Sequence, residues 1–384
     1  MQAKSKSKGK KIGRAINRTL TTIIFIVNIV VIAALLLAIS GWYVPPYKNA
    51  IPSYFGLAFP FILVVNVLFM LFWLILFKWK LFLADLIILI LCWSPILTYF
   101  PIHSKTDNIP EDCIKILSYN TRGFNWKTGK DARNNPIFDY INESGADIIC
   151  LQEFTMDNYK PNPKGIISIR EVDEILKDYP YRSIVKFGHS LSRYSFGVAC
   201  YSKYPILKTT EIPVQSTTNG SVLYEIKIND KVISLINNHL ESNRITSEDK
   251  KLYKDFMEAK DREHLDEVAS NIRSRLGIAY RTRAYQADII SHWINNRETD
   301  ATIVCGDFND TPISYAYKTI RGDLLEDSFV DTGIGPGITY HENKFWFRID
   351  YILHSRNMEA FNFTVEKVKY SDHYPVYTYL RFKD

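Results

Sequence analysis

The chain has 384 residues, enough for more than one structural unit, and a formal net charge of +6. Residues 1–100 hold ten Lys/Arg and one acid and carry +9, so residues 101–384 carry about −3 and are not marked as a nucleic-acid binder by the overall basic balance. The five cysteines are spread singly without a Cys-x-x-Cys pair, which argues against a cysteine-ligated zinc site.

The first hundred residues predict a membrane region. A basic tail at 1–19 precedes three apolar runs at 20–44, 54–77 and 81–100, and the only charge within these runs is Asp85. Each run has the ~20 residues that a helix needs to cross the hydrocarbon core. A cleaved signal peptide is the alternative for the first run, but the run is long for that purpose and two more runs follow it. We therefore expect three transmembrane helices.

The basic residues predict how these helices are oriented. The tail holds seven Lys/Arg and the turn after the second run holds Lys78 and Lys80, whereas the loop between the first two runs holds only Lys48. The positive-inside rule then places the tail and the Lys78–Lys80 turn in the cytoplasm. After a linker at 101–112, the rest of the chain lies on the extracytoplasmic side of the cell or inner membrane.

Residues 113–384 predict a strand-rich α/β domain. Short runs rich in Val, Ile, Tyr and Phe are bounded by Gly, Asn, Asp and Pro, as strands are. They lie at 114–119, 147–151, 197–201, 223–228, 232–237, 302–305, 349–353 and 376–382. Helical patterns fall between some of them, at 135–144, 247–275 and 281–296. This order favours two sheets packed face to face with helices outside, rather than an eight-fold barrel.

A charge-rich helical insertion at 243–275 separates two of the strands that carry motifs. One interpretation is a solvated helical hairpin, because charge runs usually form solvated faces. The other is a lid that gates substrate near the membrane surface. Both interpretations stay open at this point.

Six short clusters of acid, amide and histidine residues follow or lie within the predicted strands. They are Ser-Tyr-Asn120, Leu-Gln-Glu153, Asn-Asn238-His239, Gly-Asp307-Phe-Asn309, Arg-Ile-Asp350-Tyr and Ser-Asp372-His373. Hydrolysis of a phosphate ester needs a divalent metal, a positioned water and donors that match the developing charge. Mg²⁺ prefers carboxylate and carbonyl oxygens, which these clusters supply without any cysteine. The clusters therefore predict metal-assisted phosphoester hydrolysis.

Several positions fit particular parts of this chemistry. Glu153 follows an apolar strand and is a strong candidate for a metal ligand, and Asn120 ends another strand and can add a carbonyl oxygen. For either residue alone, the alternative is an ordinary turn residue. Gly306 permits a tight turn that aims Asp307 and Asn309 at one point.

The acid and histidine residues suggest how protons are handled. Asp350 lies in a strand, where an unpaired carboxylate is costly to bury, and a histidine partner would relieve that cost and fix the tautomer of the ring. Asp372 and His373 are adjacent, so both reach one site only if a local turn bends them inward. His239, flanked by Asn238, is a further donor.

The ordered set of motifs resembles the endonuclease/exonuclease/phosphatase superfamily, with its deoxyribonuclease I-like fold, over residues 113–384. The matching segments are Leu117-Ser-Tyr-Asn120, Asp147-Ile-Ile-Cys-Leu-Gln-Glu153, Gly197-Val-Ala-Cys-Tyr-Ser-Lys-Tyr-Pro-Ile206, Asn238-His239-Leu240, Gly306-Asp-Phe-Asn309, Arg348-Ile-Asp-Tyr351 and Ser371-Asp-His373. The resemblance implies a four-layer α/β sandwich, with two packed mixed sheets flanked by helices. It also implies a Mg²⁺-dependent hydrolase of ester bonds, with Mn²⁺ as an alternative cofactor.

The resemblance further implies roles around a metal site. Glu153 would be the principal Mg²⁺ ligand, with Asn120 beside it and Asp372 in support. Asp307 would orient or deprotonate the attacking water, and Asn309 would contact the phosphate.

The histidines also receive roles by this resemblance. His373, oriented by Asp350, would act on the phosphoryl group as an acid, a base or a stabiliser. His239 would donate to a phosphate oxygen or protonate the leaving group. Which histidine is the acid and which the base stays open.

The motifs define a reaction and leave the substrate open. We favour a nuclease-type phosphodiesterase, with Arg122, Asn238 and Tyr194 as candidate substrate contacts, although a charge of −3 on residues 101–384 counts against binding a phosphate backbone. The alternative is a phosphoesterase for phospholipid, sphingomyelin or inositol-phosphate groups, which tethering to a bilayer suggests. A catalytically inactive binding module is more distant, because the whole set of acids and histidines is present. The expected partners are the phosphate-ester substrate and the bilayer, and no protein partner follows from the sequence.

Overall fold

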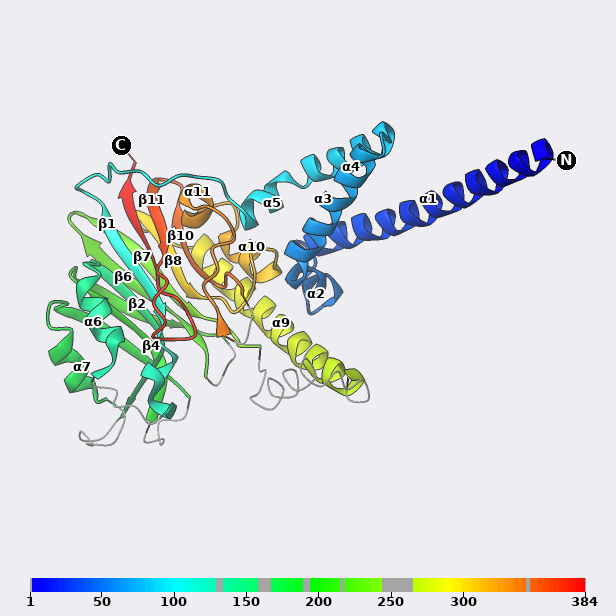
Figure 1. Ribbon diagram of the computed structural model, residues 1–384. Helices are drawn as coiled ribbons and strands as arrows, with labels where there is room; N and C mark the ends of the chain where they lie inside the picture. The colour runs from blue at the N-terminus through cyan, green and yellow to red at the C-terminus, as the bar shows by residue number, and fades with distance from the viewer. Residues whose placement is uncertain are drawn as a thin grey trace.

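Two packed β-sheets with helices on their outer faces form the body of the molecule, and a helical N-terminal region projects from it (Figure 1). The computed structural model describes residues 2–128, 134–157, 167–188, 194–214, 216, 218–243, 265–342 and 346–383. The N-terminal helices are α1 (Gln2–Ser40), α2 (Ile51–Leu57), α3 (Phe59–Ile75), α4 (Trp79–Leu91) and α5 (Trp93–Tyr99).

Each sheet has six strands with one parallel pair at its centre. The first sheet runs in the order β11-β12-β1-β2-β4-β3, and the second in the order β5-β6-β7-β8-β10-β9. The pairs β1–β2 and β7–β8 are parallel, and their neighbours on both sides are antiparallel. The strands are β1 (Ile114–Asn120), β2 (Ile148–Asp157), β3 (Tyr181–Phe187), β4 (Tyr194–Ser202), β5 (Ile206–Ile212), β6 (Gly220–Ile228), β7 (Lys231–His239), β8 (Ala301–Asp307), β9 (Leu325–Asp327), β10 (Asp350–Ser355), β11 (Met358–Val365) and β12 (Val376–Phe382).

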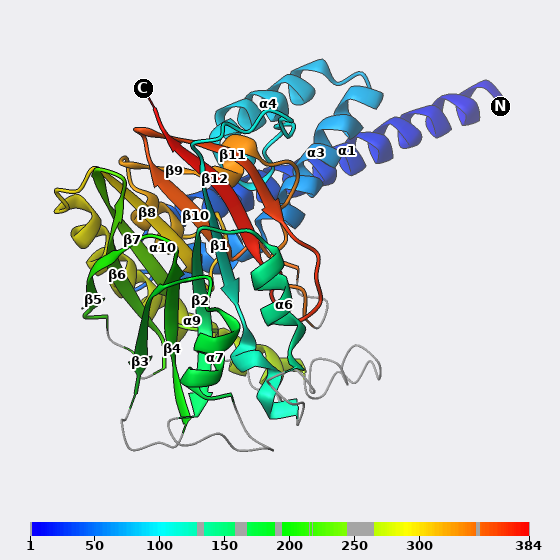
Figure 2. The same ribbon diagram turned by 90° about the vertical axis from the view of Figure 1, so that its left-hand side faces the viewer.

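Alternating apolar side chains on the strands build the layers. Ile233 and Leu235 of β7 face the core between the sheets, whereas Ile236 faces a second core on the outside, as the two-residue period of a strand requires. The remaining helices are η1 (Arg122–Thr128), α6 (Pro136–Glu143), α7 (Ile169–Ile175), α9 (Leu265–Asn295), α10 (Tyr315–Arg321) and α11 (Ser328–Thr332). Helices α6 and α7 lie over the first sheet and α9 and α10 over the second (Figure 2). The expected sandwich of two mixed sheets flanked by helices is confirmed.

The elements depart from the sequence expectations in two places. The helical patterns expected at 247–275 and 281–296 are not separate, because α9 is continuous from Leu265 to Asn295. Of the insertion at 243–275, residues 244–264 lie outside the described part of the chain. Strand β2 also continues to Asp157 instead of stopping before Glu153.

The helical region matches the membrane prediction only in part. Residues 18–40 of α1 form the single described helix that is long and apolar enough to cross a membrane by itself. Helices α2 and α3 meet at 71°, and α4 and α5 at 63°, so each pair reaches the required length only when its two helices are counted together. By length and composition, the chain therefore has one spanning helix, or three if each bent pair is one span.

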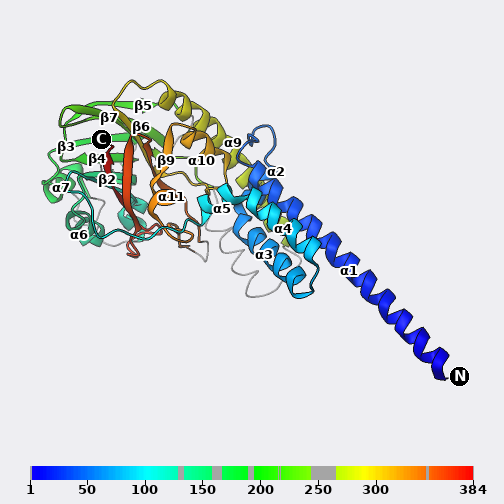
Figure 3. The same ribbon diagram turned by 90° about the horizontal axis from the view of Figure 1, so that it is seen from above.

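The helical region packs directly on the α/β body (Figure 3). Ile313, which follows β8, is buried in an apolar cluster with residues of α1, α3 and α5. The indole Nε1 of Trp42 donates to the carbonyl of Pro312 at 2.8 Å. Tyr47 stacks on Tyr285 of α9 with ring centres 4.5 Å apart. The body is therefore held against the helices at several separate points.

A buried arginine joins the two parts close to the strand that begins at Asp350. The side chain of Arg348 is fully buried and donates to Asp327 at 2.8 Å and to the carbonyl of Thr98, in α5, at 2.5 Å. Asp327 also accepts from the hydroxyl of Tyr317 at 2.7 Å. Because Arg348 lies just before β10, this pair fixes the start of that strand against the helical region.

We expect Arg348→Met to destabilise the whole chain, because it leaves the carboxylate of Asp327 buried without its cation. Breaking a buried ion pair from one side costs about 3–5 kcal/mol. Thermal unfolding of the detergent-solubilised chain measures the loss as a lower apparent melting temperature. The exposed Arg356 on the same chain segment is the control, and Arg356→Met should melt within the error of the wild type. Equal melting of the two variants would contradict this account of Arg348.

Candidate active site

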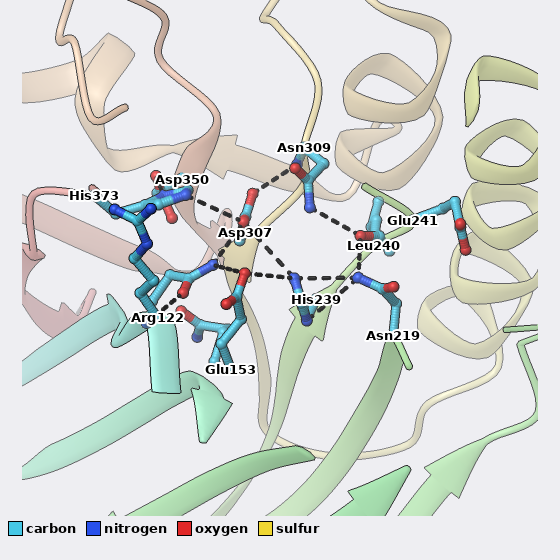
Figure 4. Close-up of polar contacts among 12 residues, drawn as sticks. Arg122, Glu153, Asn219, His239, Leu240, Glu241, Asp307, Asn309, Asp350 and His373 are labelled. Carbon is cyan, nitrogen blue, oxygen red and sulfur yellow. Dashed lines mark hydrogen bonds and ion pairs between the residues drawn. The ribbon is translucent and has the colours of Figure 1, made fainter. Parts of the chain in front are cut away.

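The ends of the two central parallel pairs meet at one edge of the sandwich (Figure 4). Strand β1 ends at Asn120, β7 at His239 and β8 at Asp307, and β2 carries Glu153 near the same edge. Parallel strands carry their carboxyl ends on one side of a sheet, where α/β proteins commonly bind ligands. The antiparallel neighbour β10 begins at Asp350 on this edge, directly opposite Asp307.

Asp307 lies at the centre of the group, with 1% of its surface exposed. Its Oδ2 accepts from the amide of Asn120 at 2.9 Å, and its Oδ1 accepts from the backbone N–H of Asn309 at 2.7 Å. The Nε2 atoms of His373 and His239 lie 3.7 and 3.9 Å from Oδ2. Burial raises the pKa of Asp307 to about 7, against the opposing effect of the positive charge on His373.

His373 is paired with Asp350. Its Nδ1 lies 2.9 Å from Oδ2 of Asp350, and because a carboxylate accepts, Nδ1 carries a proton and Nε2 faces Asp307. Burial by itself would lower the pKa of His373, but the charges of Asp350 and Asp307 outweigh it and hold that pKa well above its ordinary value. The ring of Tyr340 packs edge-on against the imidazole at 5.1 Å between centres. His373 is therefore held as a cation in a fixed orientation.

His239 lies on the other side of Asp307 and has the opposite electrostatic setting. Burial lowers its pKa, and the nearby charge of Glu153, whose Oε1 is 3.8 Å from Nε2, only partly offsets that effect. The amide Nδ2 of Asn219 lies 3.1 and 3.3 Å from the two ring nitrogens and also donates to the carbonyl of Leu240. The site thus places a neutral and a cationic histidine on either side of one carboxylate.

Glu153 lies in a β-bulge. The pairing of β2 with β4 shifts between Leu151 and Phe154, and the φ angle of Glu153 is +47°, in the left-handed region that such side chains rarely occupy. The bulge brings Oε1 within 3.3 Å of the amide of Asn120 and leaves 42% of the side chain exposed. Backbone strain of this kind is commonly found at functional sites.

The donor set around Glu153 fits a hard divalent cation. The Oδ1 of Asn120 accepts from the backbone N–H of Arg122 at 3.0 Å, so its Nδ2 points at both carboxylates. As placed, Asn120 acts as a donor between Glu153 and Asp307, and the exposed Glu153 is the carboxylate that an incoming cation can reach. A second group, formed by Asp307, Asp350 and His373, has ligand atoms within 4.8 Å of one another, but a protonated His373 has no lone pair to offer a metal.

Asp372 lies at the rim of the site and faces Arg122. The Nε of Arg122 is 3.6 Å from Oδ2 of Asp372, and its Nη2 is 2.7 Å from Oε1 of Glu342. The hydroxyl of Ser371 donates to the carbonyl of Asn120 at 2.8 Å, which brings the Asp372 segment beside β1. Two acids therefore share the charge of Arg122, which lies at the mouth of the site.

A left-handed turn sets the position of Arg122. The φ angles from Arg122 to Asn125 lie between +49° and +60°, a conformation that costs about 1–2 kcal/mol for each non-glycine residue. The buried ring of Phe124 stacks on Phe138 with centres 4.7 Å apart, and the amide of Asn125 donates to the carbonyl of Tyr370 at 2.5 Å. These contacts hold the turn in place.

One of the predicted substrate contacts, Asn238, is not brought to this group. Asn238 is fully buried, lies on the opposite face of β7 from His239, and its amide has no hydrogen-bond partner within the described residues. The adjacent Asn237 instead shares the face of His239 and accepts from Gln152 at 2.7 Å between the sheets. Tyr194 begins β4, but its side chain lies outside the described part of the structure.

Asn309 lies beside Asp307, and two residues that the sequence did not indicate, Asn219 and Glu342, support the site. Asn309 has a φ of +53°, and its amide donates to the carbonyl of Leu240 at 3.0 Å. Sequence reasoning missed Asn219 and Glu342, which hold His239 and Arg122. Neither lies at the end of a predicted strand, and the sequence carried no signal for their positions.

The match to known families agrees with this geometry. The model of the Endonuclease/Exonuclease/phosphatase family matches residues 117–373, and the chain belongs to this family. Membership indicates a hydrolase of phosphate esters, and such enzymes typically use divalent metals. Residues 21–99 match a domain of unknown function, DUF8431. No curated protein matches the chain.

Several solved structures are similar to the body of the molecule. A family member from Leptotrichia buccalis is 18% identical, covering 70% of this chain and 100% of its own, with a TM-score of 0.48. A family member from Bacteroides thetaiotaomicron is 16% identical, covering 71% and 98%, with a TM-score of 0.47. D. rerio TDP2 complexed with a single-strand DNA product is also 16% identical, covering 71% and 100%, with a TM-score of 0.47.

We expect Asp350→Asn to lower the pKa of His373, because the substitution removes the nearest charge that favours the imidazolium form. A pH titration of ¹³C-labelled histidine by NMR on the full chain measures this shift, which should amount to about one unit or more. Glu359→Gln is the control: it removes an acid on β11 that pairs with Arg381 on β12, and it should leave the pKa of His373 unchanged. An unchanged His373 titration in Asp350→Asn would contradict the pairing.

Proposed function

We propose that this chain is a membrane-anchored, divalent-metal-dependent phosphodiesterase that hydrolyses its substrate by attack of water, with a nuclease-type activity favoured. The observation that carries the proposal is the buried carboxylate of Asp307, held between a cationic and a neutral histidine beside the exposed Glu153. Cleavage of a phosphodiester needs one group to activate water and another to stabilise or protonate the departing oxygen. The arrangement offers both kinds of group within a few ångströms.

Asp307 and His373 supply the proton chemistry in this proposal. Asp307 accepts the proton of the attacking water, and its raised pKa of about 7 suits a base that works near neutral pH. His373, kept protonated and oriented by Asp350, donates from Nε2 to a phosphoryl oxygen. The burial of this trio excludes bulk water and strengthens these interactions.

His239 and Asn309 contact the phosphate from the other side. A neutral His239 has one N–H to donate, either to a phosphate oxygen or to the leaving group. Asn309 lies in the turn after β8, and its backbone N–H donates to Asp307, which helps to fix the position of that turn.

Glu153 would hold the metal ion, with Asp372 in support across Arg122. A divalent cation bound there would neutralise charge on the phosphoryl and leaving oxygens. Mg²⁺ would suit a carboxylate ligand, and Mn²⁺ is an alternative. Asn120 keeps the Glu153 and Asp307 carboxylates close by donating to both, which limits their mutual repulsion.

A lipid head group is the second candidate substrate, supported by a cavity that reaches Tyr374, the residue after His373. This cavity of about 410 Å³ is lined by apolar groups that include Phe329, Ile338 and the exposed Trp346, and by the basic side chains of Lys105 and Lys367. An apolar cavity with cationic groups in its wall suits an acyl chain that carries an anionic head group. Arg122, shared between two acids, offers little free positive charge for a long phosphate backbone.

The anchor in this proposal consists of three spans over residues 20–100, preceded by a cytoplasmic tail at 1–19 and followed by the linker at 101–112. The apolar helix at 18–40 and the two bent helix pairs support it. The distribution of Lys and Arg then puts the catalytic domain at 113–384 on the extracytoplasmic side.

Glu153→Gln and His373→Ala should each lower hydrolysis by the full chain by about 10²–10⁴-fold, through loss of the metal carboxylate and of the phosphoryl donor. The assay compares Mg²⁺ with EDTA on plasmid DNA, RNA, sphingomyelin, phosphatidylinositol phosphates and bis-p-nitrophenyl phosphate. The exposed Glu211 on β5 and His292 on α9 provide the matched controls Glu211→Gln and His292→Ala, which should retain activity. Absence of EDTA-sensitive turnover on every substrate, or full activity in both site variants, would overturn the enzyme proposal.

Protease added to intact spheroplasts should digest the catalytic domain, because the proposed topology places it outside the cytoplasm. Immunoblotting for the C-terminus measures the loss of signal over time. A cytoplasmic protein of the same cells is the control and should stay intact. Protection of the C-terminus until the membrane is permeabilised would show that the orientation is reversed.

A further inference from the structure

A second cluster of acid and histidine side chains lies outside the active site, at the edge of the second sheet. It consists of Glu326 on β9, Asp331 on α11 and His354 on β10, whose ligand atoms all lie within 4.8 Å of one another. Glu326 and His354 are directly opposed in the antiparallel pair β9–β10, so their side chains share one face. Along β10, His354 is about 13 Å from Asp350 at ~3.3 Å per residue, so this cluster is separate from the active site.

The imidazole of His354 has an unusual setting. Its side chain is 1% exposed, and its Nδ1 lies 3.1 Å from the carbonyl oxygen of Ser355. Since a carbonyl only accepts, Nδ1 carries the proton, and in a neutral ring Nε2 presents a bare lone pair. That Nε2 has no hydrogen-bond partner within the described residues, and it points at Oδ2 of Asp331 from 3.4 Å.

A bare imidazole nitrogen facing carboxylates is unfavourable unless a positive charge lies between them. We propose that a divalent cation of the zinc type binds there, held by Nε2 of His354 and by the carboxylates of Glu326 and Asp331. A donor bond from Nδ1 to a backbone carbonyl is the usual support of a metal-ligating histidine, because it fixes the tautomer and the ring orientation. The imidazole favours Zn²⁺ over Mg²⁺ and Ca²⁺, which prefer oxygen ligands alone.

Two other positive charges, a proton on His354 and the ammonium of Lys383, could compete with a metal cation at this cluster. A proton on Nε2 would turn the contact with Asp331 into an ordinary ion pair. The ammonium of Lys383 lies 3.6 Å from Glu326 and neutralises part of its charge. Glu326 and Asp331 keep 37% and 39% of their side chains exposed, which leaves the carboxylates open to a cation from solvent.

The bound cation would act as a structural clip. It joins β9, β10 and α11, three elements that otherwise meet at the edge of the sheet. Asp327, next to Glu326, binds the buried Arg348 that also reaches Thr98 of the helical region. The cation would therefore stabilise the junction between the helices and the strand that carries Asp350.

The test uses the full chain in detergent, stripped with EDTA and then loaded with Zn²⁺ in the presence of excess Mg²⁺. After gel filtration, plasma mass spectrometry counts the retained zinc. The wild type should retain about one Zn²⁺ per chain, and Asp331→Asn and Glu326→Gln should lose most of it. Asp323→Asn, which removes a nearby exposed acid two residues before β9, should retain it. Zinc should also raise the melting temperature of the wild type and of Asp323→Asn, and leave that of Asp331→Asn unchanged.

The partly exposed positions of Glu326 and Asp331 favour folded variants, and retained hydrolysis confirms that the active site is intact. X-ray absorption at the zinc edge should show one imidazole among the ligands, and His354→Gln should remove that signal. Zinc retained equally by Asp331→Asn and the wild type would overturn the proposal. Loss of zinc in Glu153→Gln together with its retention in Asp331→Asn would also overturn the proposal, because the ion would then belong to the active site.

Discussion

Burial of the Asp307 carboxylate between the two sheets is the constraint on which the site depends. A buried carboxylate needs donors, and here they come from both sheets: Asn120 from the first, and the turn at Asn309 from the second. His373 adds a positive charge that Asp350 holds in place. The sheets must therefore pack in one register for Asp307 to be satisfied, and the same packing assembles the groups for phosphoester hydrolysis.

The central parallel pairs explain why so much of the site follows from the sequence. Ligands in α/β sheets commonly bind beyond the carboxyl ends of the strands, so polar residues at those ends are candidates for the chemistry of a site. Asn120, His239 and Asp307 lie at such ends, so their apolar runs and polar termini predicted them without any knowledge of the packing. The sandwich itself followed from the alternation of short apolar runs with helical patterns. The pairing of His373 with Asp350 was implied by the family resemblance and is seen at 2.9 Å, whereas the nearby charges that raise the pKa of His373 became visible only in the structure.

The remaining features depend on local backbone geometry that composition does not encode. The bulge at Glu153 turns a strand position into an exposed carboxylate, and the left-handed turn at Arg122 moves a charge to the rim, both against the usual preferences of those residues. Asn238 was expected at the site because it directly precedes His239. Counting alternate positions from Ile233 would have placed Asn237, with His239, on the inner face.

The contacts between the helices and the body fix the position of the site relative to the helical region. Arg348 ties the start of β10 to Thr98, and Trp42 and Ile313 tie the loop after β8 to the first helices. Both attachments lie within a few residues of catalytic candidates, so the two strands that carry them are fixed relative to the helical region. A tether of this kind differs from a flexible linker, because, with the helices spanning a bilayer as proposed, it would hold the site at a set position relative to that bilayer. A substrate presented at the membrane surface would meet a preoriented site, whereas a soluble polymer would gain nothing from that geometry. Under the proposed anchoring, the junction would favour substrates confined to the membrane surface, so the lipid substrates in the comparison are as informative as the nucleic acids.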